Sequence, residues 1–101
     1  MTDRYRIVIA DDVFTKLDEI FDYIKNEQRS PQNAQSVVDR LVKDIYSLEF
    51  MPQRCTKVRT KRFPAAGYRK LISKPYLITF RIDEHLKAVY VVSLRHGAQK
   101  S

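Results

Sequence analysis

Residues 76–95, YLITFRIDEHLKAVYVVSLR, contain two runs in which apolar and polar side chains alternate on either side of a short link. In the first run every second residue is apolar: Tyr76, Ile78, Phe80 and Ile82. In the second run one face holds Tyr90, Val92 and Leu94, and the other holds Val91, Ser93 and Arg95. A period of two is typical of β-strands with one buried face, and the link at residues 83–86 has the length of a hairpin connection. The sequence therefore predicts a β-hairpin here.

Two further strands flank this hairpin in the sequence. Residues 68–73 form a third strand-like run, joined to residue 76 by Lys74-Pro75. Near the N-terminus, Tyr5, Ile7 and Ile9 alternate with Arg6 and Val8, which predicts a short strand with one buried face.

Two segments between these strands have the spacing of amphipathic helices. The first follows Asp11-Asp12, whose carboxylates suit the first turn of a helix, and ends near Gln28-Arg29-Ser30-Pro31. Its apolar residues are Val13, Leu17, Ile20, Phe21 and Ile24. The second begins with Ser30 before Pro31 at the first helical position and is stopped by Pro52. Its apolar residues are Ala34, Val38, Leu41, Ile45 and Leu48.

The predicted order is strand, helix, helix, strand, strand, strand, in a single domain over residues 1–101. The fold class is α+β, with a helical hairpin packed on one face of a small, mainly antiparallel sheet. One hairpin covers only one face, so the opposite face is expected to be available for a partner. We expect Arg69, Arg81 and Arg95 to converge on that face.

Charge is divided unevenly along the chain. Residues 1–50 carry 7 Lys and Arg against 10 Asp and Glu, a net charge of −3, whereas residues 51–101 carry 12 against 2, a net charge of +10. The irregular segment 51–66 contains five cations and no carboxylate: Arg54, Lys57, Arg59, Lys61 and Arg62. Such a concentration favours a phosphate-rich or acidic partner over a purely solubilising role.

Composition excludes several classes of protein. Apolar and charged fractions of 44% and 31% are those of a soluble globular protein, and no stretch has the roughly 20 apolar residues of a membrane span. The N-terminus has no signal-peptide pattern, so a cytoplasmic location is expected. With Cys55 as the only cysteine, only two glycines and only two histidines, no disulfide, metal site or cofactor is expected.

Several side chains are candidates for chemistry. The guanidinium fork of the three strand arginines suits phosphate oxygens. His96 follows the last strand, where it is either a proton-transfer group for RNA cleavage or a surface histidine. His85 in its turn and the single thiol of Cys55 are interpreted as structural. Four aromatics are able to stack on bases, although aromatics of a sheet more often belong to the core: Tyr68, Tyr76, Phe80 and Tyr90.

With these residues in place, the chain resembles the RelE/ParE superfamily of bacterial type II toxin–antitoxin toxins over nearly its whole length. The resemblance lies in the order and spacing of the segments 17–24, Ser30-Pro31 with Ala34, Ile45 to Pro52, 67–71, 76–83 and 91–97. It implies a growth-inhibiting toxin that is neutralised by a cognate antitoxin protein.

The resemblance leaves two molecular targets. RelE-like members are ribosome-dependent, metal-independent mRNA endonucleases, and this reading is favoured here on the basic loop and His96. It implies Arg69, Arg81 and His96 as catalytic residues. The residues implied to hold RNA are Lys57, Arg59, Lys61, Arg62 and Arg95. The alternative is a ParE-like, non-enzymatic inhibitor of DNA gyrase, which the Arg95-His96-Gly97 ending fits equally well.

Overall fold

The alternating runs of the C-terminal half form three antiparallel strands, β3 (Tyr68–Ser73), β4 (Tyr76–Asp83) and β5 (Ala88–His96). This computed structural model describes residues 4–58 and 67–97. The edge strand β1 (Arg6–Ile9) pairs in parallel with β5, and the two-residue strand β2 (Thr56–Lys57) pairs with β3. The result is a five-stranded sheet of order β1-β5-β4-β3-β2, which confirms the predicted α+β class and its mainly antiparallel sheet.

Both predicted helices are present, α1 (Asp11–Glu27) and α2 (Pro31–Tyr46). Helix α2 starts as expected, because the hydroxyl of Ser30 accepts a hydrogen bond of 3.2 Å from the amide of Asn33. Helix α1 has Ala10 at its N-cap and no side-chain cap, so Asp11 and Asp12 stabilise its first turn through the helix dipole alone.

The chain from α2 to β2 is more regular than its sequence indicated. Two 3-10 turns, η1 (Ser47–Glu49) and η2 (Pro52–Arg54), lead into β2. Met51 joins the turns in the left-handed region, with φ of 48°. The sequence predicted no strand between residues 51 and 66, because a two-residue strand is too short to show a period of two.

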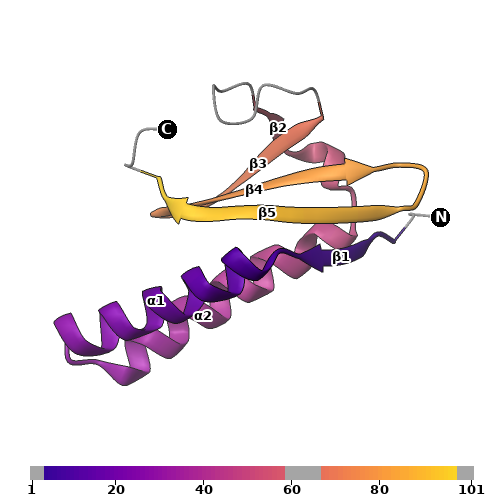
Figure 1. The fold of residues 1–101 in the computed structure, drawn as a ribbon. Coiled ribbons are helices and arrows are strands. Elements are labelled where there is room, and N and C mark those ends of the chain that lie inside the picture. The colour runs from indigo at the N-terminus through magenta and orange to yellow at the C-terminus, as the bar shows by residue number, and fades with distance from the viewer. Residues whose placement is uncertain (1–3, 59–66, 98–101) are drawn as a thin grey trace.

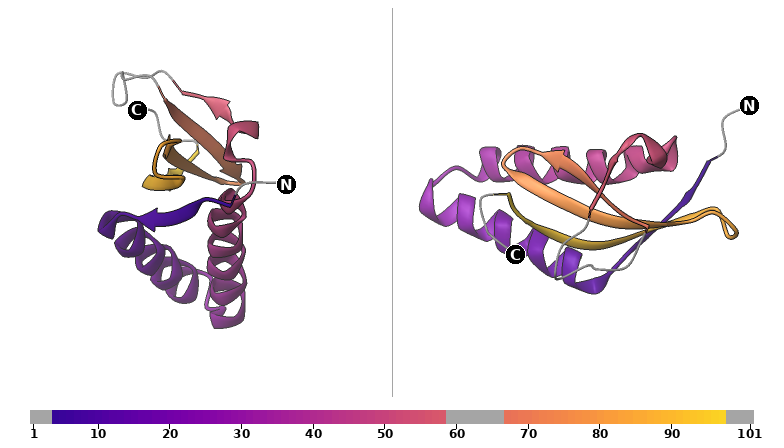
Figure 2. Two further views of the ribbon diagram at one scale, coloured as in Figure 1. Left: turned by 90° about the vertical axis from the view of Figure 1, so that its right-hand side faces the viewer. Right: turned by 90° about the horizontal axis from the view of Figure 1, so that it is seen from above.

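The helical hairpin covers one face of the sheet (Figures 1 and 2). The core between them is built from the apolar stripes of both helices and the inward residues of β4 and β5. Its buried members include Val13, Leu17, Ile20, Ile24, Ala34, Leu41, Ile45, Leu48, Ile78, Phe80, Val89, Val91 and Leu94. The turn between α1 and α2 lies beyond the end of the sheet in Figure 1, so the distal turns of the hairpin have no strand above them.

A bulge in β5 corrects the predicted faces of that strand. Thr79 pairs with Ser93 and Phe80 with Val91, so Val92 is an extra residue without a partner of its own. The side-chain alternation shifts by one residue at such a bulge. Val89 and Val91 before the bulge and Leu94 after it therefore all lie in the core. The predicted face of Tyr90, Val92 and Leu94 is wrong for that reason.

No helix within residues 4–58 and 67–97 is both long and apolar enough to cross a membrane.

Candidate functional site

The strand register assigns every strand residue to one of two sheet faces. We call the face that packs on the helices the covered face and the opposite one the open face. Residues opposite one another in paired strands share a face. From the pairing, the open face consists of Arg6, Val8, Thr56, Tyr68, Lys70, Ile72, Leu77, Thr79, Arg81, Asp83, Ala88, Tyr90, Ser93 and Arg95.

At the centre of the open face, Arg81 lies between two tyrosines. Its backbone partners are Tyr68 on β3 and Tyr90 on β5. The guanidinium carbon of Arg81 is 4.7 Å from the centroid of the Tyr90 ring, a cation–π contact. The prediction that the sheet aromatics belong to the core holds for Phe80, which is fully buried, but not for Tyr68 and Tyr90.

Arg69 lies on the covered face, and the predicted convergence of three arginines is wrong for this residue. It pairs with Phe80, one residue out of phase with Arg81. Its Nη1 donates to the carbonyl oxygens of Cys55 at 2.7 Å and Gln53 at 3.1 Å. Arg69 thus fixes the chain that follows η2 to β3, while Arg81 and Arg95 remain together on the open face.

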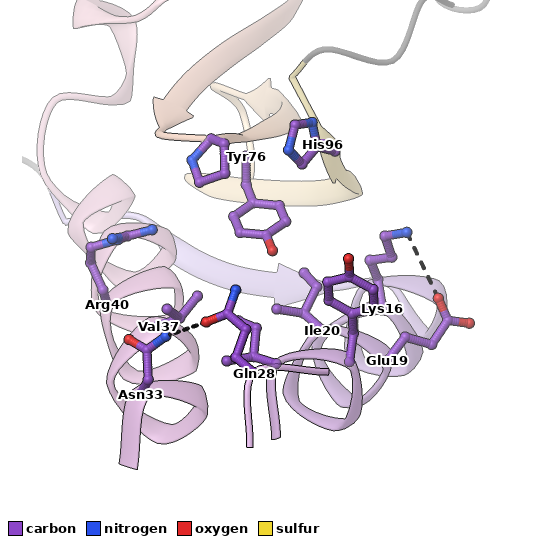
Figure 3. A pocket seen from close by; sticks show the side chains of 12 residues that line it. Lys16, Glu19, Ile20, Gln28, Asn33, Val37, Arg40, Tyr76 and His96 are labelled. Carbon is purple, nitrogen blue, oxygen red and sulfur yellow. Dashed lines mark hydrogen bonds and ion pairs between the residues drawn. The ribbon is translucent and has the colours of Figure 1, made fainter. Parts of the chain in front are cut away.

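His96 lies at the end of the covered face, in a cleft of about 630 Å³ between the distal turns of the helices and the start of β4 (Figure 3). It pairs with Tyr76, and the two rings meet edge to face with centroids 5.7 Å apart. The other residues that line the cleft are Lys16, Glu19, Ile20, Tyr23, Ile24, Gln28, Asn33, Val37, Arg40 and Pro75.

The cleft is partly closed by its own polar contacts. Asn33 donates to the side-chain oxygen of Gln28 at 2.8 Å, and Lys16 forms an ion pair with Glu19 at 3.8 Å. Burial raises the pKa of Tyr76, against the opposing effect of the nearby Arg40. At neutral pH the phenol therefore stays protonated, and it is a poor base.

The three residues implied as catalytic are not gathered at one point. Arg81 is on the open face, whereas Arg69 and His96 are on the covered face. Arg69 and His96 are also separated along the sheet, since they pair with Phe80 and Tyr76 respectively.

Of the residues implied to hold RNA, Arg95 is half-buried on the open face and Lys57 is exposed on β2. The other three predicted RNA contacts, Arg59, Lys61 and Arg62, lie outside the described residues.

Cys55 is buried, as predicted for a structural thiol. Its pKa is raised by burial, an effect that Arg54 and Arg69 partly oppose. A thiol with a raised pKa holds little thiolate at neutral pH, so it is a weak nucleophile. Within residues 4–58 and 67–97, no group of three or more His, Cys, Asp or Glu side chains is placed to hold a metal ion.

The sequence reasoning missed Lys70 and the pairing of Tyr68 and Tyr90 around Arg81. The sequence did contain a signal that Tyr68 and Lys70 share a face, because Tyr68, Lys70 and Ile72 alternate within β3. The position of Tyr90 beside Arg81 was hidden by the bulge at Val92, which reverses the phase of β5 between its two ends.

Comparison with known proteins agrees with this fold. A family model, described as the ParE toxin of the type II toxin–antitoxin system parDE, matches residues 7–101. No protein of curated function matches the chain.

Three solved structures are similar over most of their length. One is from the chromosomal ParDE toxin–antitoxin system of P. aeruginosa, with 18% identity, a TM-score of 0.72, and 92% of this chain and 96% of that one covered. The RelBE2 toxin–antitoxin complex of Mycobacterium tuberculosis has 17% identity and a TM-score of 0.63, with 96% of this chain and 95% of that one covered. The archaeal RelE–RelB complex of Pyrococcus horikoshii has 14% identity and a TM-score of 0.62, with 96% of this chain and 99% of that one covered. At these identities the likeness concerns the fold.

Proposed function

The chain belongs to the ParE toxin family of type II toxin–antitoxin systems, and from this membership we propose that it inhibits DNA gyrase without catalysing a reaction of its own. In this proposal the toxin acts by protein contacts, and a cognate antitoxin keeps it inactive. The proposal replaces the mRNA endonuclease that the basic loop and His96 favoured on sequence grounds.

The observation that carries the proposal is the separation of Arg69, Arg81 and His96. Cleavage of RNA needs a base, an acid and cationic groups within hydrogen-bond reach of one phosphate. Here Arg69 donates to two backbone carbonyls on the covered face, while Arg81 contacts Tyr90 on the open face. His96 stands in a third place, against Tyr76 in the cleft. This arrangement favours a binding protein over a nuclease.

The antitoxin is inferred from the family and from the charge of this chain. Two of the similar solved structures are toxin–antitoxin complexes. The net charge of +10 in residues 51–101 favours a partner with an acidic segment. We therefore expect the protein encoded beside this toxin to bind it through such a segment and to restore growth when the two are expressed together.

The test is a supercoiling and cleavage assay with purified gyrase, relaxed plasmid, ATP and the purified toxin. We expect loss of supercoiling and accumulation of linear plasmid after denaturation of the enzyme, and recovery when the antitoxin is added. A parallel reaction contains a reporter mRNA in a reconstituted translation system and is read by primer extension. New 5′ ends in the message together with unaffected gyrase would overturn the proposal in favour of the nuclease.

A further inference from the structure

We propose that the cleft between the helical hairpin and the start of β4 binds a small organic carboxylate. Arg40 and Tyr76 hold the carboxylate group of this ligand, and its apolar or aromatic body lies against Ile20, Ile24 and Val37. The inference goes beyond the gyrase proposal and does not depend on it, because it concerns a ligand of the toxin alone.

The size and the lining of the cleft are those of a small-molecule site. Its volume of about 630 Å³ lies within the range of roughly 300–1,000 Å³ that is usual for such sites. Ile20 and Ile24 of α1 and Val37 of α2 supply the apolar part of the lining. Tyr23 of α1, whose residue surface is 63% exposed, adds an aromatic ring. The cleft is therefore able to bury the apolar body of an organic molecule.

Arg40 supplies the positive charge of the site. Its Nη2 donates a hydrogen bond of 2.7 Å to the carbonyl oxygen of Lys74, which fixes the guanidinium beside the cleft. Arg40 forms no ion pair with any residue of the ranges 4–58 and 67–97. Glu19, the carboxylate of the described lining, is already paired with Lys16 at 3.8 Å. The guanidinium is thus available to an external carboxylate, which its planar fork suits.

Tyr76 supplies a neutral hydrogen-bond donor. Figure 3 shows its ring directed from β4 into the cleft, and the edge-to-face contact with His96 holds the ring there. Its hydroxyl makes no hydrogen bond with the part of the chain that the structure describes. Arg40 and Tyr23 both act on the pKa of Tyr76 by their charge, so the three groups lie close together. Because burial raises that pKa, the phenol keeps its proton at neutral pH and is able to donate it to a carboxylate oxygen in a hydrogen bond.

The combination of these groups determines the class of ligand. Inorganic phosphate would use the guanidinium and the phenol but would leave the apolar lining in water. A neutral apolar molecule would use the lining but would leave the charge of Arg40 without a partner. A carboxylate on an apolar body satisfies both parts of the cleft.

Two polar pairs at the cleft favour a free molecule over a peptide. Asn33 donates to Gln28 at 2.8 Å, and Lys16 is paired with Glu19. These pairs satisfy side chains that a longer chain would otherwise use for its backbone groups. A compact ligand that contacts only Arg40, Tyr76 and the apolar lining leaves both pairs intact.

The experiment titrates the full ¹⁵N-labelled chain with 3-phenylpropionate at pH 7 and follows its amide resonances by NMR. Two matched probes separate the parts of the ligand: 3-phenylpropanamide lacks the charge, and acetate lacks the apolar body. We expect 3-phenylpropionate to bind with a Kd on the order of 0.1–1 mM, since a ligand of this size has few atoms to contribute. The shifts should be confined to residues around the cleft, and both matched probes should bind roughly tenfold more weakly or worse.

Three variants test the site, each checked for a native NMR spectrum. Arg40→Gln removes the charge and should weaken binding of 3-phenylpropionate by roughly tenfold. Tyr76→Phe keeps the ring and its contact with His96 but removes the hydroxyl, and should weaken binding by roughly threefold to tenfold. Arg6→Gln makes the same charge change at an exposed position on the open face and should have no effect.

Four outcomes would overturn the proposal. The first is the absence of shifts around the cleft at about 10 mM 3-phenylpropionate, well above the expected Kd. The second is equal binding of the amide, which would reduce the cleft to an apolar surface. The third is a loss with Arg6→Gln as large as that with Arg40→Gln. The fourth is a tripeptide ending in phenylalanine with a free carboxylate that binds roughly tenfold more tightly than 3-phenylpropionate, since it would assign the cleft to a peptide.

These measurements contain no gyrase, so the two proposals fail separately. A toxin that binds 3-phenylpropionate through Arg40 but leaves gyrase unaffected would refute the gyrase proposal and support this one. A toxin that inhibits gyrase but does not bind the probe would do the reverse.

Discussion

The covered and open faces of the sheet are built from the same strands, yet neighbouring residues on them have different roles. On the covered face Phe80 is fully buried against the helices, while Arg81, the next residue, stands among tyrosines on the open face. The two arginines Arg69 and Arg81 differ in the same way, because one holds backbone carbonyls and the other contacts an aromatic ring. The role of an arginine in a strand therefore depends first on which face of the sheet its side chain occupies.

The largest expected effect concerns the neighbours Phe80 and Arg81. Phe80→Ala should lower the free energy of unfolding by about 3–5 kcal/mol, because it removes a fully buried ring and leaves a cavity. Arg81→Ala should lower it by about 1 kcal/mol, since it removes one cation–π contact between half-buried side chains. Urea unfolding followed by circular dichroism measures both.

If Phe80→Ala does not fold, Ile78→Val on the same face provides a graded test, with an expected loss of about 1 kcal/mol. Equal losses for the Phe80 and Arg81 variants would show that the two faces are not distinguished as the register indicates.

Arg69 provides the next largest effect. Arg69→Ala should lower the free energy of unfolding by about 2 kcal/mol, because the carbonyls of Gln53 and Cys55 lose a charged donor. The free energy of unfolding of Arg69→Lys should lie between those of Arg69→Ala and the wild type, since an ammonium keeps the charge without the planar fork. Thermal or urea unfolding gives the values. A variant Arg69→Ala that is fully stable but not toxic would instead support the catalytic role implied by the family resemblance.

The smallest effect lies in a hydrogen-bond network at the end of the sheet, where β1 begins beside the β4–β5 turn. The hydroxyl of Tyr5 donates to Glu84 at 2.6 Å, and the amide of Gln53 donates to the same carboxylate at 2.8 Å. These bonds hold the pKa of Glu84 below its ordinary value of 4.5.

A carboxyl whose pKa is lowered by folding stabilises the protein fully above its unfolded pKa and loses that contribution as the pH falls through the folded value. We therefore expect stability to decline with acid from about pH 4.5 downward, and the decline to be shallower in Glu84→Gln. Tyr5→Phe removes the main donor and should also make it shallower. Unfolding midpoints measured at several pH values test this, and an unchanged slope in both variants would exclude the network as its source.

Much of the fold was predictable from local patterns. The helices between residues 11 and 46 were predicted from apolar spacing and from the Ser30-Pro31 start, and the structure confirms both. The strands β3, β4 and β5 were predicted from alternation. The short strand β2 was not, because two residues carry no period and its existence depends on β3 as a partner.

The candidate surfaces were less predictable than the elements that carry them. Arg81 and Arg95 were correctly expected on the open face, whereas Arg69 was assigned to the wrong one. Tyr68 and Tyr90 were named as aromatics of the sheet, but the position of Tyr90 beside Arg81 was missed, since a bulge of one residue at Val92 changes the phase of β5. A bulge is a relation between two strands, and neither strand shows it when its sequence is taken alone.

The amino-acid sequence by itself determined the class of the fold, the order of its helices and strands and the concentration of positive charge in residues 51–101. These are properties of composition and of spacing along the chain, which local sequence patterns express directly. Only the tertiary structure decided that Arg69 donates to a backbone carbonyl, that the ring of His96 contacts that of Tyr76 in a cleft and that Arg81 contacts the ring of Tyr90. Each of these contacts depends on the register between strands, and register is fixed by packing between residues distant in the chain.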